Sequence, residues 1–265
     1  MAIRVAVTGA CGRMGREVVK MVLEDSELQL VAAIDPSATG SDAGTIVGKS
    51  ACGVAIESDL ELALVQSHAD VMVDFTTPHT VMNNVKTAIR LKVRPVVGTT
   101  GFSPEDIALL DKLAREQQIG GIIAPNFSIG AILMMKFAAQ AAKYLPHVEI
   151  IEYHGDQKLD APSGTSIKTA ELISQSRQEL KQGNPNETEV IEGARGGYIN
   201  GFRIHSVRLP GVFAQQEVIF GGHGQTLKIR HDSYDRAGYM PGVNVAVKKV
   251  LDVQGIVYGF EHFLD

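Results

Sequence analysis

The chain has 265 residues and a formal net charge of −5 at pH 7, with 45% hydrophobic and 21% charged residues. This is the composition of a globular protein, and it lacks the excess of Lys and Arg that binding to a phosphate backbone requires, so we expect no nucleic-acid partner. No apolar stretch reaches the ~20 residues of a membrane span and the N-terminus carries no secretory signal, so we expect a cytoplasmic protein without membrane insertion. Cys11 and Cys52 have no CxxC spacing, which argues against a metal site.

The first motif is a glycine turn between a strand and a helix. IRVAVT at 3–8 predicts a strand, GACGRMG at 9–15 is the turn, and the apolar periodicity after it is typical of a helix. A second predicted strand over 28–35 ends in Asp35, twenty residues beyond the turn. Such glycines let the backbone approach a pyrophosphate at a helix N-terminus, and the acid can accept hydrogen bonds from a ribose. The spacing is GxxGxxG rather than GxGxxG, but strand, helix and acid together favour a bound dinucleotide.

Strands and helices continue to alternate through the first half. We predict strands over 69–75, 93–102 and 119–128 and helices over 79–91 and 104–118, the last with Ser103 as N-cap and Pro104 as its first residue. Such alternation predicts an α/β, Rossmann-like, doubly wound parallel sheet, whose ligands bind at the carboxyl ends of the strands. Those ends carry the loops TTPH, GTTG and APNFS, each able to offer backbone groups to a cofactor.

The second half changes to a pattern rich in strands. An apolar helix is expected over 129–145, and the tail from Pro241 returns to helix. Between them, glycine-rich turns separate long β-prone runs, which predicts an α+β domain on an antiparallel or mixed sheet. The predicted strands are 147–153, 188–193, 199–211, 215–222 and 225–233.

The stretch EYHGDQKLDAPSGTS at 152–166 concentrates the chemistry of this half. Ser163, Gly164 and Thr165 precede a predicted helix, where free backbone N–H groups and hydroxyls form an anion site. His154 ends a predicted strand and Lys158 follows in a loop. A histidine can donate a proton near neutral pH, and a lysine can neutralise charge that develops during a reaction. The combination predicts an active site for an anionic substrate.

Motifs along nearly the whole chain resemble those of the dihydrodipicolinate reductases, which belong to the diaminopimelate route of lysine biosynthesis. The motifs are GACGRMG, DFTTP, GTTGF, APNFS, EYHGDQKLDAPSGT and HSVRLPG, of which KxDAPSGT is highly specific. The resemblance implies reduction of 4-hydroxy-tetrahydrodipicolinate, a small dicarboxylate, through dihydrodipicolinate to tetrahydrodipicolinate with NADH or NADPH. It also implies a dinucleotide domain over 1–127 completed by 236–265, a substrate domain over 128–235, and a homotetramer built through the substrate-domain sheets.

The resemblance also assigns roles to single residues. His154 matches the family's proton donor and Lys158 its second essential group, while Gly164 and Thr165, preceded by Ser163, match the substrate carboxylate site. The cofactor contacts match Gly9, Ala10, Cys11, Gly12, Arg13, Met14, Asp35, Gly98, Thr99, Thr100, Ala124, Pro125, Asn126 and Phe127. Since Asp35 would repel a 2′-phosphate whereas Arg13 could swing onto one, we expect both nicotinamide cofactors to be used.

One position of the substrate site departs from the family pattern. Members usually carry a second histidine directly after the proton donor, and this chain has Gly155 there. One contact to the substrate carboxylate is therefore missing. The sequence leaves two alternatives to the reductase open. Another two-domain enzyme, such as an amino-acid dehydrogenase, is opposed by KxDAPSGT, and a non-catalytic nucleotide-binding sensor is opposed by His154 and Lys158.

Overall fold

The computed structural model describes residues 1–264 and divides into two compact units. The first unit comprises residues 1–128 and the C-terminal segment from Tyr239, and the second comprises residues 129–238. Among the described residues, no helix is both long enough and apolar enough to cross a bilayer.

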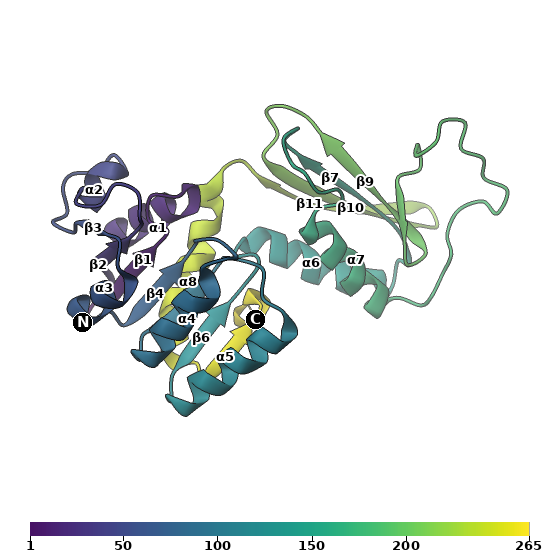
Figure 1. The fold of residues 1–265 in the computed structure, drawn as a ribbon. Coiled ribbons are helices and arrows are strands. Elements are labelled where there is room, and N and C mark those ends of the chain that lie inside the picture. The colour runs from purple at the N-terminus through teal and green to yellow at the C-terminus, as the bar shows by residue number, and fades with distance from the viewer. Residues whose placement is uncertain (265) are drawn as a thin grey trace. The chain divides into compact units, whose positions relative to one another are not determined.

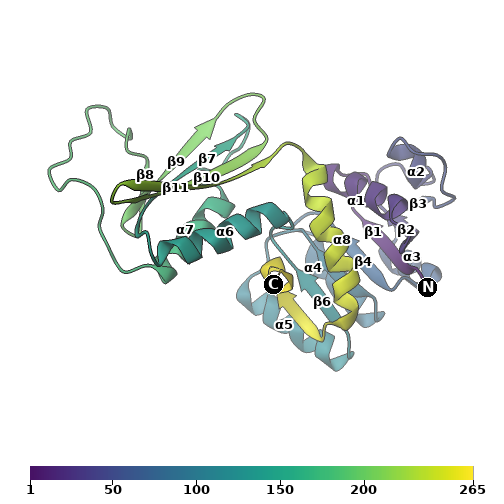
Figure 2. The same cartoon turned by 180° about the vertical axis from the view of Figure 1, so that it is seen from behind.

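The first unit is built on a seven-stranded sheet in which every pair of neighbouring strands is parallel (Figure 1). Its order is β12-β6-β5-β4-β1-β2-β3, with α3, α4 and α5 on one face and α1 and α8 on the other (Figure 2). The predicted doubly wound α/β fold is thereby confirmed. The strands are β1 (Ile3–Thr8), β2 (Leu28–Ile34), β3 (Ile56–Glu57), β4 (Val71–Asp74), β5 (Arg94–Val97), β6 (Gly120–Ile123) and β12 (Gly255–Tyr258). The helices are α1 (Arg13–Glu24), α2 (Ala43–Ile46), α3 (Leu60–Ser67), α4 (Val81–Arg90), α5 (Pro104–Glu116) and α8 (Met240–Lys249).

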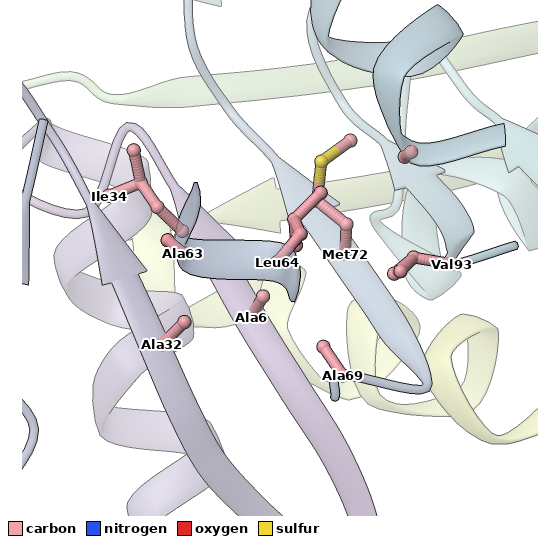
Figure 3. Packing of buried hydrophobic residues seen from close by; sticks show 9 residues of the cluster. Ala6, Ala32, Ile34, Ala63, Leu64, Ala69, Met72 and Val93 are labelled. Carbon is pink, nitrogen blue, oxygen red and sulfur yellow. The ribbon is translucent and has the colours of Figure 1, made fainter. Parts of the chain in front are cut away.

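The strands of this sheet are continuous apolar runs in the sequence because helices cover both faces of the sheet. All four residues of β4 are buried, as expected for a parallel strand covered by helices on both sides. Figure 3 shows Ala63 and Leu64 of α3 among Ala6, Ile34 and Met72, which belong to three adjacent strands. The small alanines let the helix approach the sheet closely, and the larger side chains fill the remaining space.

The start of α5 agrees with its prediction. The Ser103 hydroxyl accepts a hydrogen bond of 3.1 Å from the backbone N–H of Asp106, and the Asp106 carboxylate accepts one of 2.9 Å from the backbone N–H of Ser103. This capping box, with Pro104 at the first helical position, satisfies two N–H groups that the helix itself cannot pair.

The second unit is a mixed five-stranded sheet with α6 (Ile129–Ala142) and α7 (Gly164–Ser176) on one face (Figures 1 and 2). The sheet order is β11-β10-β7-β9-β8, in which β7 and β9 are parallel and the other neighbours antiparallel. Alternate side chains point to opposite faces, so the helix-covered inner face of β7 carries Val148 and Ile150 whereas its outer face carries Glu149 and Ile151. The strands are β7 (His147–His154), β8 (Gly197–Ile199), β9 (Phe202–Arg208), β10 (Ala214–Gly222) and β11 (Gln225–Ser233).

One prediction of secondary structure was wrong and two were incomplete. Residues 188–193 lie outside regular structure, because Val190 and Ile191 are exposed and nothing buries the apolar side chains that favoured a strand. The strand predicted over 199–211 is shorter, β9 over Phe202–Arg208, because Asn200 and Gly201 adopt positive φ angles of 46° and 91° and form the turn between β8 and β9. The C-terminal tail contains not only a helix but also β12, which adds an edge strand beside β6.

Asp25, directly after α1, ties the C-terminal segment to the rest of the first unit. Its Oδ2 accepts a hydrogen bond of 2.6 Å from Asn244 and lies 2.9 Å from Nζ of Lys248, and both partners are on α8. The hydrogen bond from Asn244, followed by those from Lys248 and the backbone of Glu27, lowers the pKa of the Asp25 carboxyl to about 2. Because this value lies below that of the unfolded chain, the carboxylate stabilises the fold fully above about pH 4 and loses this effect as the pH falls toward 2.

Replacing Asp25→Asn should therefore lower the free energy of unfolding at pH 7 by about 1 kcal/mol, the scale of a partly exposed hydrogen-bonded ion pair. The difference from the wild-type chain should shrink between pH 4 and pH 2, as the wild-type carboxylate takes up its proton. Urea titrations at pH 7 and pH 3 measure both values. Lys112→Met is the control, because the 3.9 Å pair of Lys112 with Glu116 is exposed and should contribute little. A difference that stays constant with pH would contradict this account.

Candidate active site

The glycine turn of the first unit is shaped by close backbone contacts. Gly9 has a positive φ of 77°, and a Cβ on it would lie 2.6 Å from the carbonyl oxygen of Phe75. A Cβ on Gly15, in the first turn of α1, would collide with the carbonyl oxygen of Gly9. Any side chain at either position would therefore push apart β1, the loop after β4 and the start of α1.

The N-terminus of α1 fits an anionic group. Gly12 is the N-cap and provides no side-chain cap for this helix, while Ala10 is buried and Arg13 exposed. The backbone N–H groups of the first turn, which includes Arg13 and Met14, have no acceptor within the helix. They point out of the N-terminal end of the helix, where its dipole is positive. A Cβ on Gly12 would lie 3.1 Å from the carbonyl oxygen of Gly9. Tight, uncapped backbone at this place suits the pyrophosphate of a dinucleotide.

Asp35 lies beside this turn, directly after β2. Its Oδ2 accepts a hydrogen bond of 3.0 Å from the backbone N–H of Cys11, and its Oδ1 accepts hydrogen bonds from the backbone N–H and the hydroxyl of Ser37, at 2.9 and 2.5 Å. The carboxylate thus fixes the glycine turn to the loop after β2. Burial, together with the nearby charge of Asp35, raises the pKa of the Cys11 thiol, so this cysteine is a neutral part of the turn.

A second carboxylate, which was not predicted as a site residue, organises the neighbouring loops. Asp74 ends β4, is fully buried, and accepts hydrogen bonds from Thr76, Asn84 and Thr99 at 2.8–2.9 Å. Thr99 belongs to the predicted GTTG loop after β5, so the carboxylate joins the loops of two adjacent strands. An acid at the end of the apolar run VMVD was the available signal in the sequence.

Two of the remaining predicted cofactor residues, Gly98 and Phe127, lie against the ring of Phe75. A Cβ on Gly98 would overlap the Phe75 ring, and the ring of buried Phe127 lies 6.1 Å from it between centroids. Ala124 donates a hydrogen bond of 2.9 Å to the carbonyl of Val97, which fixes the start of the APNFS loop. The structure thus brings the loops after β4, β5 and β6 together at one edge of the sheet. Within these loops Thr100 and Pro125 are exposed, and the side-chain oxygen of Asn126 accepts a hydrogen bond of 2.8 Å from the backbone N–H of Ser128.

In the second unit the inner face of the sheet changes from apolar to polar toward the EYHGDQKLDAPSGTS loop. Val218, Ile150 and Ile204 form one buried row across β10, β7 and β9. The next row toward the loop is Gln216, Glu152 and Ser206, and the last is Ala214, His154 and Arg208. Since strand residues two apart share a face, Glu152 and His154 necessarily project to the same side. The helix-covered face of the sheet therefore ends in polar side chains where β7 enters the EYHGDQKLDAPSGTS loop.

Glu152 is fully buried and joins the two charged neighbours of the last row. One carboxylate oxygen is hydrogen-bonded to Nδ1 of His154, and the other lies 2.8 Å from Nη2 of Arg208. Burial raises the pKa of the Glu152 carboxyl, but hydrogen bonds from His154, Arg208 and Ser206 outweigh this effect and lower it to about 2. Glu152 is therefore ionised at neutral pH. Neither Glu152 nor Arg208 was predicted as a site residue.

Lys158 lies in the loop that follows. Its ammonium group is 2.6 Å from the Asp160 carboxylate, and its backbone N–H donates a hydrogen bond of 3.1 Å to the carbonyl of Gly155. The Lys158 side chain is 26% exposed and that of Asp160 60%, so the lysine is the more buried of the two. Gly155 has no positive φ, and a Cβ there would lie 3.2 Å from the carbonyl oxygen of Val212.

The predicted anion site is the N-terminus of α7. Ser163 is its N-cap and accepts a hydrogen bond of 3.2 Å from the backbone N–H of Ser166, while Gly164 is exposed and Thr165 half-buried. Below the cap, Ser166 donates to Gln216 at 2.7 Å, and Gln216 donates to Thr169 at 2.8 Å. This buried network anchors the helix start to β10, next to Glu152. It was missed because nothing in a single sequence pairs Ser166 with a residue 50 positions away.

These groups could bind a dinucleotide in the first unit and an anion in the second, with a histidine and a lysine available for proton and charge transfer. Among residues 1–264, no cluster of three or more His, Cys, Asp or Glu side chains could hold a metal ion.

Comparisons with known proteins agree with this chemistry. The family model "Dihydrodipicolinate reductase, N-terminus" matches residues 3–127, and "Dihydrodipicolinate reductase, C-terminus" matches residues 130–264. The 4-hydroxy-tetrahydrodipicolinate reductase of Geobacillus kaustophilus (strain HTA426) is 54% identical over 265 residues, covering 100% of both chains. That of Listeria innocua serovar 6a is 52% identical over 263 residues, covering 99% of this chain and 100% of its own.

Solved structures give the same result for the fold. A dipicolinate-bound dihydrodipicolinate reductase from Paenisporosarcina sp. TG-14 superposes with a TM-score of 0.89 at 47% identity, over 100% of both chains. An amine dehydrogenase from Mycobacterium smegmatis shares the fold alone, with a TM-score of 0.71 at 17% identity over 98% of this chain and 96% of its own. Because the two family models together span nearly all of the sequence, the chain belongs to the dihydrodipicolinate reductase family.

Proposed function

We propose that this protein reduces 4-hydroxy-tetrahydrodipicolinate, through dihydrodipicolinate, to tetrahydrodipicolinate in the diaminopimelate route of lysine biosynthesis. The observation that carries the proposal is the junction of β7 with α7, where His154, Lys158 and a helix N-terminus capped by Ser163 occur within ten residues. The relative from Paenisporosarcina, at 47% identity, is described as bound to dipicolinate, a dicarboxylate of the expected kind. In this proposal residues 1–127 with 236–265 serve the cofactor, and residues 128–235 serve the substrate.

The cofactor is NADH or NADPH, which supplies the hydride when bound. The first turn of α1 would receive the pyrophosphate, and the carboxylate of Asp35 would accept hydrogen bonds from the ribose. The loops at 98–100 and 124–127 would border the nicotinamide half of the cofactor. Gly9 and Gly12 leave room for the backbone to approach the phosphates, and Arg13, exposed at the start of α1, is free to reach a 2′-phosphate.

The substrate is a cyclic dicarboxylate with a conjugated imine. Free N–H groups at Gly164 and Thr165 and the positive end of α7 would bind one carboxylate. Conjugate addition of hydride to such a system leaves an anion shared between the ring nitrogen and the carbon next to the imine carbon, and that carbon must gain a proton to restore the C=N bond of the product. His154 donates this proton, and Lys158 leaves Asp160 to neutralise the developing charge.

The catalytic roles predict clear losses of turnover. His154→Ala and Lys158→Ala should each lower kcat by ~10²–10⁴-fold, the usual contribution of a general acid or base, and leave the Kd of NADPH nearly unchanged. The assay generates the substrate enzymatically and follows the absorbance of the reduced nicotinamide. Lys168→Ala is the control, because Lys168 is exposed on α7 beyond the loop. A normal kcat in either variant would remove that residue from the mechanism, and a wild-type chain without turnover would favour the nucleotide sensor.

Asp35 should influence the choice of cofactor. A carboxylate repels a 2′-phosphate by up to ~4 kcal/mol for unit charges 4 Å apart at an effective dielectric of 20. Asp35→Ala should therefore raise the NADPH/NADH ratio of kcat/KM, although both values can fall because the glycine turn loses its anchor. Ser37→Ala also loosens this anchor but keeps the charge, so it should leave the ratio unchanged. An unaltered NADPH/NADH ratio of kcat/KM in Asp35→Ala would mean that Asp35 does not contact the ribose.

Gly155 should weaken substrate binding. A hydrogen bond to a charged group contributes about 1.5–3 kcal/mol, so an imidazole at this position should lower KM for the dicarboxylate roughly ten- to a hundredfold. We expect this of Gly155→His, with cofactor binding unchanged. Gly155→Ala is the control, because its Cβ meets the Val212 carbonyl in the same way but offers no donor. A higher KM in the histidine variant alone would show a site adapted to a small residue.

The outer face of the second sheet supports a homotetramer. Ile151, Val207 and Ile219 lie there only half-buried, among charged side chains, and β8 and β11 are open edges. Light scattering at micromolar concentration should give about four times the 28.5 kDa of one chain. Ile219→Lys should reduce this mass, whereas Leu109→Lys, on exposed α5, should not. A wild-type monomer would contradict the proposal.

We further propose that the protein, as a biosynthetic reductase, acts in the cytoplasm.

A further inference from the structure

We propose that Glu152 and Arg208 are positioning residues that hold His154 and the Lys158 loop ready for proton transfer. The inference rests on the proposed function, in which His154 is the proton donor. Its starting point is the burial of Glu152, whose side chain is 0% exposed and yet ionised. A buried carboxylate is costly unless it is paired, and a buried ion pair stabilises a fold little compared with apolar side chains of the same size. A role in the reaction accounts for its presence.

Glu152 determines which ring nitrogen of His154 is available. A carboxylate can only accept hydrogen bonds, so Nδ1 of His154 must carry the proton that it shares with Glu152. The neutral ring then has its lone pair on Nε2, and the protonated ring delivers its proton from Nε2. The carboxylate also balances the positive charge of the protonated ring beside Arg208. Orientation, tautomer and charge of the donor are thus set by one side chain.

Arg208 extends this arrangement to the lysine. Its Nη2 lies 2.8 Å from the Glu152 carboxylate and donates a hydrogen bond of 2.8 Å to the carbonyl oxygen of Asp160. Asp160 in turn holds the ammonium group of Lys158 at 2.6 Å. The backbone completes the frame, because Leu209, the next residue, donates a hydrogen bond of 3.0 Å to the carbonyl of His154. Glu152, Arg208 and the backbone of Leu209 therefore connect the proton donor with the loop that carries the second essential group.

The same strand offers a matched control. Glu149 also binds a histidine and an arginine, with 2.7 Å to Nε2 of His205 and 2.6 Å to Nη2 of Arg195. It lies on the opposite face of β7, away from α7 and its N-terminus. Replacing either glutamate by glutamine removes one carboxylate from the same strand, but only one of the two supports His154.

Glu152→Gln is the decisive variant. Arg208 has only donors, so it should take the amide oxygen and leave the amide NH₂ facing Nδ1 of His154. Nδ1 must then become an acceptor and the neutral proton must move to Nε2. In a chain labelled with ¹⁵N-histidine, His154 is assigned by its absence in His154→Gln, and spectra at a pH where the ring is neutral report which nitrogen carries the proton. We expect the proton on Nδ1 in the wild-type chain and on Nε2 in the variant.

Turnover should change with the tautomer. We expect kcat of Glu152→Gln to fall by about 10²-fold or more, as for other variants that leave a catalytic histidine in the wrong tautomer, with the KM of the cofactor unchanged. Glu149→Gln should keep kcat within about threefold and the His154 tautomer unaltered. An equal loss in both variants would mean general damage to the sheet and would overturn the inference, as would wild-type kcat or an unchanged tautomer in Glu152→Gln.

A double variant separates positioning from folding. Arg208→Met alone leaves the buried carboxylate without its cation and should lower the thermal midpoint, whereas Glu152→Gln/Arg208→Met removes both charges and should recover it. We expect kcat to stay low in the double variant; recovery of kcat together with the midpoint would show a purely structural role. If the wild-type chain has no reductase turnover, the proposed function fails, and the tautomer measurement still supports or overturns the positioning of His154.

Discussion

The buried charge of Glu152 is the constraint on which the substrate unit depends. A carboxylate removed from water must be paired, and the two side chains that pair it come from different strands: the imidazole of His154 from β7 and the guanidinium of Arg208 from β9. Satisfying one charge therefore fixes two strands and the loop between β7 and α7. The adjacent Gln216, which anchors the cap of α7, extends the same polar layer to β10.

The first unit uses carboxylates in a similar way. Asp35 and Asp74 both lie at the carboxyl edge of the parallel sheet. The strands end there, and the backbone N–H groups of the loops beyond are no longer paired by the sheet. Each acid accepts hydrogen bonds from such groups and from hydroxyls of the loops, so that Cys11, Ser37, Thr76 and Thr99 become ordered without a ligand. The cofactor loops are thus held in place before anything binds, which reduces the entropy that binding must overcome.

Local signals made part of this architecture predictable. The glycine turn, the Ser103 cap and the helix start at Ser163 depend on residues close together in sequence, and all three local structures form where they were expected. Contacts between distant segments were not predictable. Arg208 lies 48 positions beyond Asp160, and Asn244 lies 219 positions beyond Asp25, so no pattern in one sequence pairs them. The hairpin at Asn200 and Gly201 is a different case, because an Asn-Gly pair is itself a turn signal.

The geometry around Gly155 separates two effects that a missing side chain could have. Glycine would be expected to loosen the loop that carries Lys158, because it allows more backbone conformations than any other residue. The turn is closed, however, by the backbone hydrogen bond from Lys158 to the carbonyl of Gly155, which any residue could accept, and by Arg208 on the carbonyl of Asp160. The loop is therefore held at both ends by groups that do not depend on a side chain at position 155. The absence of a side chain at position 155 therefore leaves the frame around His154 and Lys158 intact.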